Sequence, residues 1–298
     1  MNAVTPIRAD EARDVYEAAG LKVTPAGPVL GAEIAGVDLG RPLEPATVAA
    51  IRTALLQYKV IAFRDQDISH EAHVAFGRHF GELEGHPVLP HVPGHPLILH
   101  IEGVDGIQWT DETIASGRGM DKWHTDVTFR ECPSMGGILR MRHMPPLGGD
   151  TLFADTAAIW RDLPDRVKER IADLRAEHDI LRSFGGRVSD EKREELQRTT
   201  PPVSHPVVRT HPETGEKALY VNHTFTSRIE GLDEGESREL LRSLTNRVKL
   251  PEYQFRFRWS PNAIVFWDNR PTQHYAVLDY WPEHRVVERV TVIGDRPV

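Results

Sequence analysis

The sequence predicts a mainly β protein with outer helices, in which two sheets form a cupin-like jelly roll, also called a double-stranded β-helix. The last fifty residues contain three strand patterns, FRFRW, AIVFWD and RVVERVTVIG. Segments with apolar residues at helical spacing occur elsewhere in the chain, and loops rich in Gly and Pro join them. Such β-rich chains commonly form double-sheet jelly rolls. All 298 residues are expected to form one domain.

The helices are expected where apolar residues recur every three or four positions. Residues 45–58 fit this spacing, with Pro45 at the start. The segment SHEAHVAFGRHFG has Ser69 as its expected N-cap and Gly81 as its stop. Further helices are expected at 155–164, 164–174 and 233–248.

Several strands are expected besides the three near the C-terminus. Residues 29–39 should form short strands and turns, and KVIAFRD at 59–65 a buried strand. Residues 205–222 read as a hairpin that turns at 213–215. A further strand is expected at 123–129, WHTDVTF.

Three segments show little periodicity. Residues 1–22 are expected to be a loosely packed lead-in, and the polar residues 185–202 to be mobile. Residues 85–122 are rich in Gly, Pro, His and Asp and are expected to be long loops. Long loops in compact domains are often lids or binding loops.

Composition excludes several classes of partner. The formal net charge is −8 without a Lys/Arg block, so neither nucleic acid nor an anionic membrane surface is favoured. There is no apolar run long enough to span a membrane and no secretory signal, so we expect a cytoplasmic protein. The single cysteine, Cys132, excludes an internal disulfide and is expected to be buried. A homo-oligomer, either dimer or tetramer, is compatible with the sequence.

His124 and Asp126 are the first candidate metal ligands. On a strand, a spacing of two places both side chains on one face. With a distant histidine such as His274, they would make the 2-His-1-carboxylate set of non-haem iron(II) oxygenases. This set leaves positions open for an oxo acid and dioxygen. The pair alone is weak evidence, because about one His-x-Asp is expected by chance in such a chain.

Arg285 and Arg289 are the candidate anion-binding residues. Four positions apart on a strand pattern, they should face the same side, roughly 13 Å apart. Inward arginines are costly unless each meets an anion, and a guanidinium fork suits a carboxylate or sulfonate. The alternative is surface ion pairing with Glu283 and Glu288, although Glu288 should point to the opposite face.

Four segments together resemble the taurine dioxygenase family, which includes the aryloxyalkanoate dioxygenases. They are WHTDVTF (123–129), GGDTLFAD (148–155), LYVNHTFTSRI (219–229) and WDNRPTQHYA (267–276). The resemblance runs from about residue 28 to the C-terminus. It implies an iron(II) enzyme that uses O2 to decarboxylate 2-oxoglutarate to succinate and CO2. The substrate would be a small anion, such as an alkyl sulfonate or sulfate, hydroxylated next to its acidic head.

The resemblance also implies roles for individual residues. The iron ligands would be His124, Asp126 and His274. Thr151 and Arg285 would bind 2-oxoglutarate. The substrate pocket would contain Arg289 and His86 at the anionic head and Phe184 and Phe225 as apolar walls.

Two positions depart from the taurine-specific pattern. Leu89 stands where those members have a tyrosine, and Met120 where they have an asparagine. Both differences remove polar partners from the expected pocket. We therefore expect anions with longer or more apolar tails to be better substrates than taurine.

Several other functions fit parts of the pattern. The first is an aryloxyalkanoate-type dioxygenase, and the second a non-catalytic cupin-like protein that binds a small acid. A zinc hydrolase would use the same ligands, but no general base lies beside them in sequence, and it gives Arg285 no role. A halogenase needs a small residue where this chain has Asp126.

Overall fold

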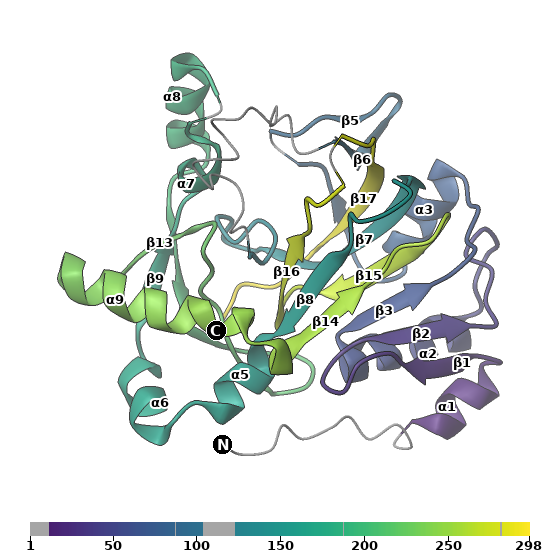
Figure 1. The fold of residues 1–298 in the computed structure, drawn as a ribbon, viewed down its shortest axis with the longest axis horizontal. Helices are drawn as coiled ribbons and strands as arrows, with labels where there is room; N and C mark the ends of the chain where they lie inside the picture. Colours follow the sequence, from purple (N-terminus) through teal and green to yellow (C-terminus); the bar gives the residue numbers. More distant parts are fainter. Residues whose placement is uncertain (1–11, 87, 104–122, 187, 281) are drawn as a thin grey trace.

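The structure is a computed structural model that describes residues 12–86, 88–103, 123–186, 188–280 and 282–298. Sheets occupy the centre of these residues and helices lie around them (Figure 1). The predicted mainly β class with outer helices is thus confirmed. None of the described helices is long and apolar enough to cross a membrane.

The larger sheet has nine strands among the described residues. Their order is β1-β2-β3-β15-β7-β17-β6-β5, and β4 also pairs with β17. The strands are β1 (Lys22–Pro25), β2 (Ala32–Ala35), β3 (Val60–Phe63), β4 (Leu83–Glu84), β5 (His91–Val92), β6 (His95–Glu102), β7 (Ser134–His143), β15 (Ile264–Asp268) and β17 (Val286–Ile293). The β2–β3 pair is parallel, and the other pairs are antiparallel.

Three smaller sheets complete the β structure of the described residues. One has the order β14-β8-β16, another β10-β9-β13, and the third is the β11–β12 hairpin. Their strands are β8 (Thr151–Asp155), β9 (Arg175–His178), β10 (Val203–Pro206), β11 (Val208–Thr210), β12 (Lys217–Leu219), β13 (Thr226–Ile229), β14 (Gln254–Phe257) and β16 (Thr272–Ala276). The hairpin predicted within 205–222 is confirmed.

The helices lie at both ends of the molecule, with α1 and α2 beside β1–β3 and with α6 and α9 on the opposite side (Figure 1). They are α1 (Arg13–Ala18), α2 (Pro45–Tyr58), α3 (His70–Arg78), α5 (Thr156–Asp162), α6 (Asp165–Ile171), α7 (Leu181–Phe184), α8 (Asp190–Thr199) and α9 (Glu234–Thr245), followed by the 3-10 turns Asn246–Lys249 and Pro251–Tyr253. The five predicted helices are confirmed. Ser69 caps α3 as predicted, accepting a hydrogen bond from the amide of Ala72 at 3.2 Å.

The strand alternation of the larger sheet separates two cores. On β17, Val287 packs with Phe153 of β8 and Phe257 of β14, between the larger sheet and the β14-β8-β16 sheet. Val290 and Val292 join the cluster on the other face, which contains residues of α2 and α3. Because successive side chains of a strand point to opposite faces, odd-numbered β17 residues face the space between the sheets.

Two sequence expectations about strands and loops are wrong. Residues 123–129 do not form a strand: only His124 makes a β-bridge, and the chain then turns. Within the expected loop region, residues 95–102 form strand β6, paired with β5 and β17. The run of Pro and His residues hid its short apolar core. Residues 104–122 lie outside the described residues.

Two segments that were expected to be weakly ordered contain helices. The segment 185–202 contains α8. Leu196 is the buried residue of this helix, so the sequence shows no row of apolar residues at helical spacing there. From residue 12 onward, the expected lead-in is held to the core. Tyr16 on α1 is 4% exposed and its hydroxyl donates to Gln57 at 2.6 Å. Cys132, expected to be buried, is exposed.

Candidate active site

Three side chains from distant parts of the sequence meet beside β16. His274 lies on this strand, and His124 pairs with it through two backbone hydrogen bonds of 3.1 and 2.8 Å. Asp126 follows in the next turn. One potential ligand atom of each lies within 4.8 Å of the others, the one such cluster found among the described residues. The structure therefore brings together the three predicted metal ligands.

The turn that carries Asp126 is anchored along its length. The hydroxyl of Thr125 donates to a carbonyl of β16 at 2.8 Å, and the amide of Asp126 donates to Asn269 Oδ1 at 3.3 Å. Val127 has φ +46°, a conformation that is strained for a β-branched residue. The hydroxyl of Thr128 contacts two buried side chains of the neighbouring sheet and loop. These contacts hold the strained turn in place.

The Asp126 carboxylate is buried against a cation. Arg289 Nη1 lies 2.5 Å from its Oδ1, and the two side chains are 8% and 5% exposed. Burial by itself raises the pKa of the Asp126 carboxyl. The charges and the hydrogen bond around the carboxylate, with the charge of Arg289 first among them, together outweigh burial, so the pKa lies well below its usual range. Asp126 is therefore an anion at neutral pH.

The donor set fits a divalent metal ion. Two imidazoles and one carboxylate are the ligands of the facial triad that holds iron(II) on one side. Burial lowers the pKa of His274 well below its usual value, so the ring is neutral at pH 7. A neutral imidazole offers the lone pair that a metal requires. His274 Nε2 lies 3.9 Å from Asp126 Oδ1, and His124 Nε2 lies 3.7 Å from it.

The predicted cosubstrate residues lie together in the same space. Thr151 begins β8, and its hydroxyl accepts a hydrogen bond from Trp259 Nε1 at 3.0 Å. Arg285 directly precedes β17 and is 5% exposed, with its guanidinium 6.0 Å from the centre of the Trp259 ring. Gly149 has φ +71°, and a Cβ there would lie 3.1 Å from Arg285 Cδ. Glycine at this position leaves space for the arginine.

The two arginines share one face, as predicted. Arg285, Val287 and Arg289 all line the same cavity. Glu288 points to the other face, where its carboxylate contacts His70 of α3 at 3.0 Å. The alternative in which Glu288 neutralises Arg289 is therefore excluded.

The predicted substrate residues line the opposite wall. His86 Nδ1 accepts a hydrogen bond from the amide of Leu89 at 3.0 Å, which fixes the ring in its loop. The His86 ring lies 5.7 Å from the ring of Phe184 on α7. Phe225 packs near His124, with ring centres 6.1 Å apart. This wall is mainly apolar.

All these groups surround one cavity of about 140 Å³. Ten of the predicted site residues line it, namely His86, Leu89, His124, Asp126, Thr151, Phe184, Phe225, His274, Arg285 and Arg289. Met120 lies outside the described residues. Most of the remaining lining is apolar, contributed by Leu99, Ile101, Val127, Leu139, Trp267, Ala276 and Val287.

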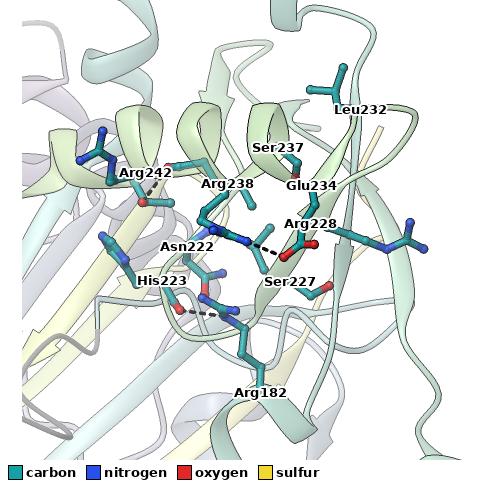
Figure 2. Close-up of a pocket in the computed structure, with 13 residues that line it drawn as sticks. Arg182, Asn222, His223, Ser227, Arg228, Leu232, Glu234, Ser237, Arg238 and Arg242 are labelled. Atoms are coloured by element: carbon teal, nitrogen blue, oxygen red, sulfur yellow. Dashed lines mark hydrogen bonds and ion pairs between the residues drawn. The ribbon is translucent and has the colours of Figure 1, made fainter.

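A larger cavity of about 660 Å³ lies elsewhere, between α9 and β13. Figure 2 shows several arginines at this cavity, with Arg238 directed to Glu234 and Arg182 to the carbonyl of His223. Arg228, a third, pairs with Glu177. The metal-ligand cluster does not line it. The larger volume of this cavity is therefore no evidence that the reaction takes place there.

Sequence reasoning missed the residues that support the metal ligands. Asn269 is fully buried and contacts both the backbone and the carboxylate of Asp126. Trp259 holds the hydroxyl of Thr151. Asn269 lies inside the WDNRPTQHYA segment, but the residues that it contacts come close to it only when the chain folds. Local sequence gives no signal for such contacts.

The fold and this cluster define the class of protein: an enzyme with a facial-triad metal site between two β-sheets. Comparison with known proteins identifies the family. The profile of the "Taurine catabolism dioxygenase TauD, TfdA family" matches residues 22–291. The chain belongs to this family and is a 2-oxoglutarate-dependent dioxygenase that uses iron(II) and O2.

Several relatives match almost the whole chain. An alpha-ketoglutarate-dependent sulfate ester dioxygenase of Pseudomonas putida is 38% identical over 286 residues, covering 93% of this chain and 91% of the relative. An alkylsulfatase of Acinetobacter baylyi is 37% identical, with coverages of 89% and 83%. A crystal structure of a taurine dioxygenase from Burkholderia xenovorans has a TM-score of 0.79 at 38% identity, with coverages of 94% and 91%. The predicted fold and family are thus confirmed.

Proposed function

We propose that His124, Asp126 and His274 hold the iron(II) ion of this dioxygenase. The convergence of these three donors and two buried arginines on one cavity carries the proposal. The low pKa of Asp126 and the neutral state of His274 give two of the donors their binding forms at neutral pH. Bound iron(II) supplies the activation of O2 that is coupled to oxidative decarboxylation of 2-oxoglutarate.

Thr151 and Arg285 bind 2-oxoglutarate in this proposal. A guanidinium fork binds a carboxylate through two parallel hydrogen bonds, so Arg285 suits the distal carboxylate. The Thr151 hydroxyl oxygen accepts a hydrogen bond from Trp259. The hydroxyl proton of Thr151 therefore points away from the indole. That proton is then free to be donated to a carboxylate oxygen.

Arg289 and His86 bind the anionic head of the primary substrate. The amide of Leu89 donates to His86 Nδ1, so a neutral His86 carries its proton on Nε2. Both residues then offer donors to an anion. Leu89, Phe184 and Phe225 provide apolar contact for its tail.

The substrate class we propose is an organic sulfate ester or sulfonate with an apolar tail. Two relatives, a sulfate ester dioxygenase and an alkylsulfatase, are 38% and 37% identical to this chain. The alternative is an aryloxyalkanoate, because a 2,4-dichlorophenoxyacetate dioxygenase of Burkholderia sp. is 30% identical. The apolar cavity wall suits either tail.

The overall reaction for a primary sulfate ester is balanced as follows. The ester, 2-oxoglutarate and O2 give succinate, CO2 and an ester hydroxylated at the carbon that bears the sulfate oxygen. That carbon–oxygen bond then breaks, releasing the aldehyde and hydrogen sulfate. The arginines orient the two anions, and the apolar wall excludes water from the reacting carbon.

A substrate panel tests this function. Anaerobically reconstituted enzyme would receive saturating 2-oxoglutarate and O2, with alkyl sulfates, alkyl sulfonates, aryloxyacetates or taurine. Succinate and the organic product are both quantified, because succinate alone also reports uncoupled turnover. We expect stoichiometric aldehyde and the highest kcat/KM with an apolar sulfate or sulfonate. A clear preference for taurine over every apolar anion would contradict the proposed substrate class.

Two further expectations are part of the proposal. We propose a cytoplasmic location, because the single, exposed cysteine suits a reducing compartment. We also propose that all 298 residues act as one domain, as a dimer or tetramer. Light scattering of the purified protein measures the latter.

A further inference from the structure

Asn269 is a fully buried residue that contacts one of the proposed metal ligands without being a ligand itself. It lies between β15 and β16 and is 0% exposed. Its side chain makes four contacts. Oδ1 accepts from Trp267 Nε1 at 2.9 Å and from the amide of Asp126 at 3.3 Å. Nδ2 donates to Ser134 Oγ at 2.6 Å and to Asp126 Oδ2 at 3.4 Å.

The orientation of this amide is fixed by its partners. An indole N–H and a backbone N–H act as donors alone, so the oxygen of Asn269 must face Trp267 and the Asp126 amide. The NH2 group must then face Ser134 and the carboxylate. A reversed amide would set two donors against two donors in a buried space, which is costly.

The two oxygens of Asp126 consequently have different surroundings. Oδ1 is the one near the histidine nitrogens, at 3.7 Å from His124 Nε2 and 3.9 Å from His274 Nε2. Oδ2 is the oxygen that faces Asn269. Arg289 Nη1 donates to Oδ1, so Arg289 and Asn269 together hold the two oxygens of the carboxylate.

Asn269 also reaches a second ligand indirectly. It fixes the indole of Trp267, whose ring centre lies 4.8 Å from that of His274. The Asn269 side chain therefore contacts Asp126 directly and affects the position of His274 through the packing of Trp267.

We propose that Asn269 is a positioning residue that holds the Asp126 carboxylate in the orientation that presents Oδ1 to His124 and His274. This inference rests on the proposed assignment of His124, Asp126 and His274 as ligands. Removing a residue that hydrogen-bonds to a metal ligand typically weakens metal affinity about 10- to 100-fold.

The test compares Asn269→Ala and Asn269→Asp with the wild-type chain by anaerobic titration with Co²⁺. Co²⁺ absorption reports both the dissociation constant and the coordination number. We expect about 10- to 100-fold weaker binding for Asn269→Ala, with a changed visible spectrum. Asn269→Asp keeps the acceptor and loses the donor, so its spectrum should also change.

Gln66→Ala is the matched control. Gln66 is a buried amide that accepts from the Leu39 amide at 2.8 Å and donates to the carbonyls of Val37 and Arg64. None of these residues lines the catalytic cavity. We expect this variant to lower the thermal midpoint while leaving the Co²⁺ dissociation constant and spectrum unchanged.

The outcomes separate the claims. If Asn269→Ala lowers the thermal midpoint as Gln66→Ala does, but keeps wild-type Co²⁺ affinity and spectrum, the inference is wrong. If it fails to fold, Ser134→Ala decides, because it removes the anchor of Nδ2. An unchanged spectrum in folded Ser134→Ala and Asn269→Asp overturns the inference. If the wild-type chain and Asp126→Ala bind Co²⁺ equally, the ligand assignment itself fails.

Discussion

The cavity beside α9 and the cavity around the metal-ligand cluster differ in size and in how their charges are arranged. The cavity beside α9 measures about 660 Å³, against about 140 Å³ for the one around the metal-ligand cluster. Two of its arginines, Arg228 and Arg238, form ion pairs near the surface; Arg238 is 73% exposed and its partner Glu234 is 88% exposed. In the small cavity, Arg289 and Asp126 are both almost fully buried. Exposed ion pairs contribute little to the free energy of unfolding. Burying two charges is costly, so a buried pair such as Arg289 and Asp126 indicates a functional role.

The largest effect expected is at the buried acid. Asp126→Ala removes one of three metal donors and leaves Arg289 without its buried carboxylate. We expect succinate formation to fall at least a thousandfold. Breaking a buried pair also costs about 3–5 kcal/mol of unfolding free energy. Urea unfolding and succinate assays measure both. Full activity in this variant would show that the reaction does not take place in the small cavity.

The two arginines should give separable effects within that cavity. Arg285→Ala should chiefly raise the 2-oxoglutarate requirement, and Arg289→Ala that for the primary substrate. Losing a buried charge partner costs about 3–5 kcal/mol, which corresponds to a more than hundredfold rise in the Michaelis constant for the affected ligand. Steady-state kinetics with each ligand varied checks this. Equal failure of both variants for both ligands would refute the division of roles.

A smaller effect should appear at the apolar wall. Leu89→Ala removes apolar contact from the tail, and each lost methylene contact is worth about 0.8 kcal/mol. We expect kcat/KM to fall roughly tenfold for a long-chain alkyl sulfate and little for a short one. The ratio between the two substrates is the measurement. Equal losses for both lengths would mean that Leu89 does not contact the tail.

The smallest effect is expected in the larger cavity. Arg242→Ala changes an exposed side chain of α9, so unfolding free energy should move by less than about 0.5 kcal/mol. Both Michaelis constants should stay within about twofold of wild type. A tenfold change in either would show that the larger cavity takes part in the reaction.

The sequence predicted elements whose signals are local. The bounds of α2 match the prediction at both ends, because Pro45 starts it and apolar residues follow at helical spacing. Helix α8 has one buried residue, Leu196, and carried no such stripe. Its cap was visible in principle, since Ser189 accepts from the Lys192 amide.

The site shows the same division. The structure brings His124 and Asp126 together with His274, yet not through the strand geometry from which they were predicted. A turn with Val127 at φ +46° presents them instead. Arg289 was predicted to meet an anion, but its contact with Asp126 depends on tertiary packing. Asn269 was missed for the same reason.

The central claim is that His124, Asp126 and His274 hold iron(II) where 2-oxoglutarate also binds. Anaerobic addition of iron(II) and then 2-oxoglutarate tests it most directly, because chelation of iron(II) by a 2-oxo acid gives a visible charge-transfer band. The wild-type chain should show this band, and Arg285→Ala should need more than a hundredfold more 2-oxoglutarate to reach it. The band should be lost in Asp126→Ala. A full band in Asp126→Ala at the wild-type 2-oxoglutarate concentration would contradict the claim.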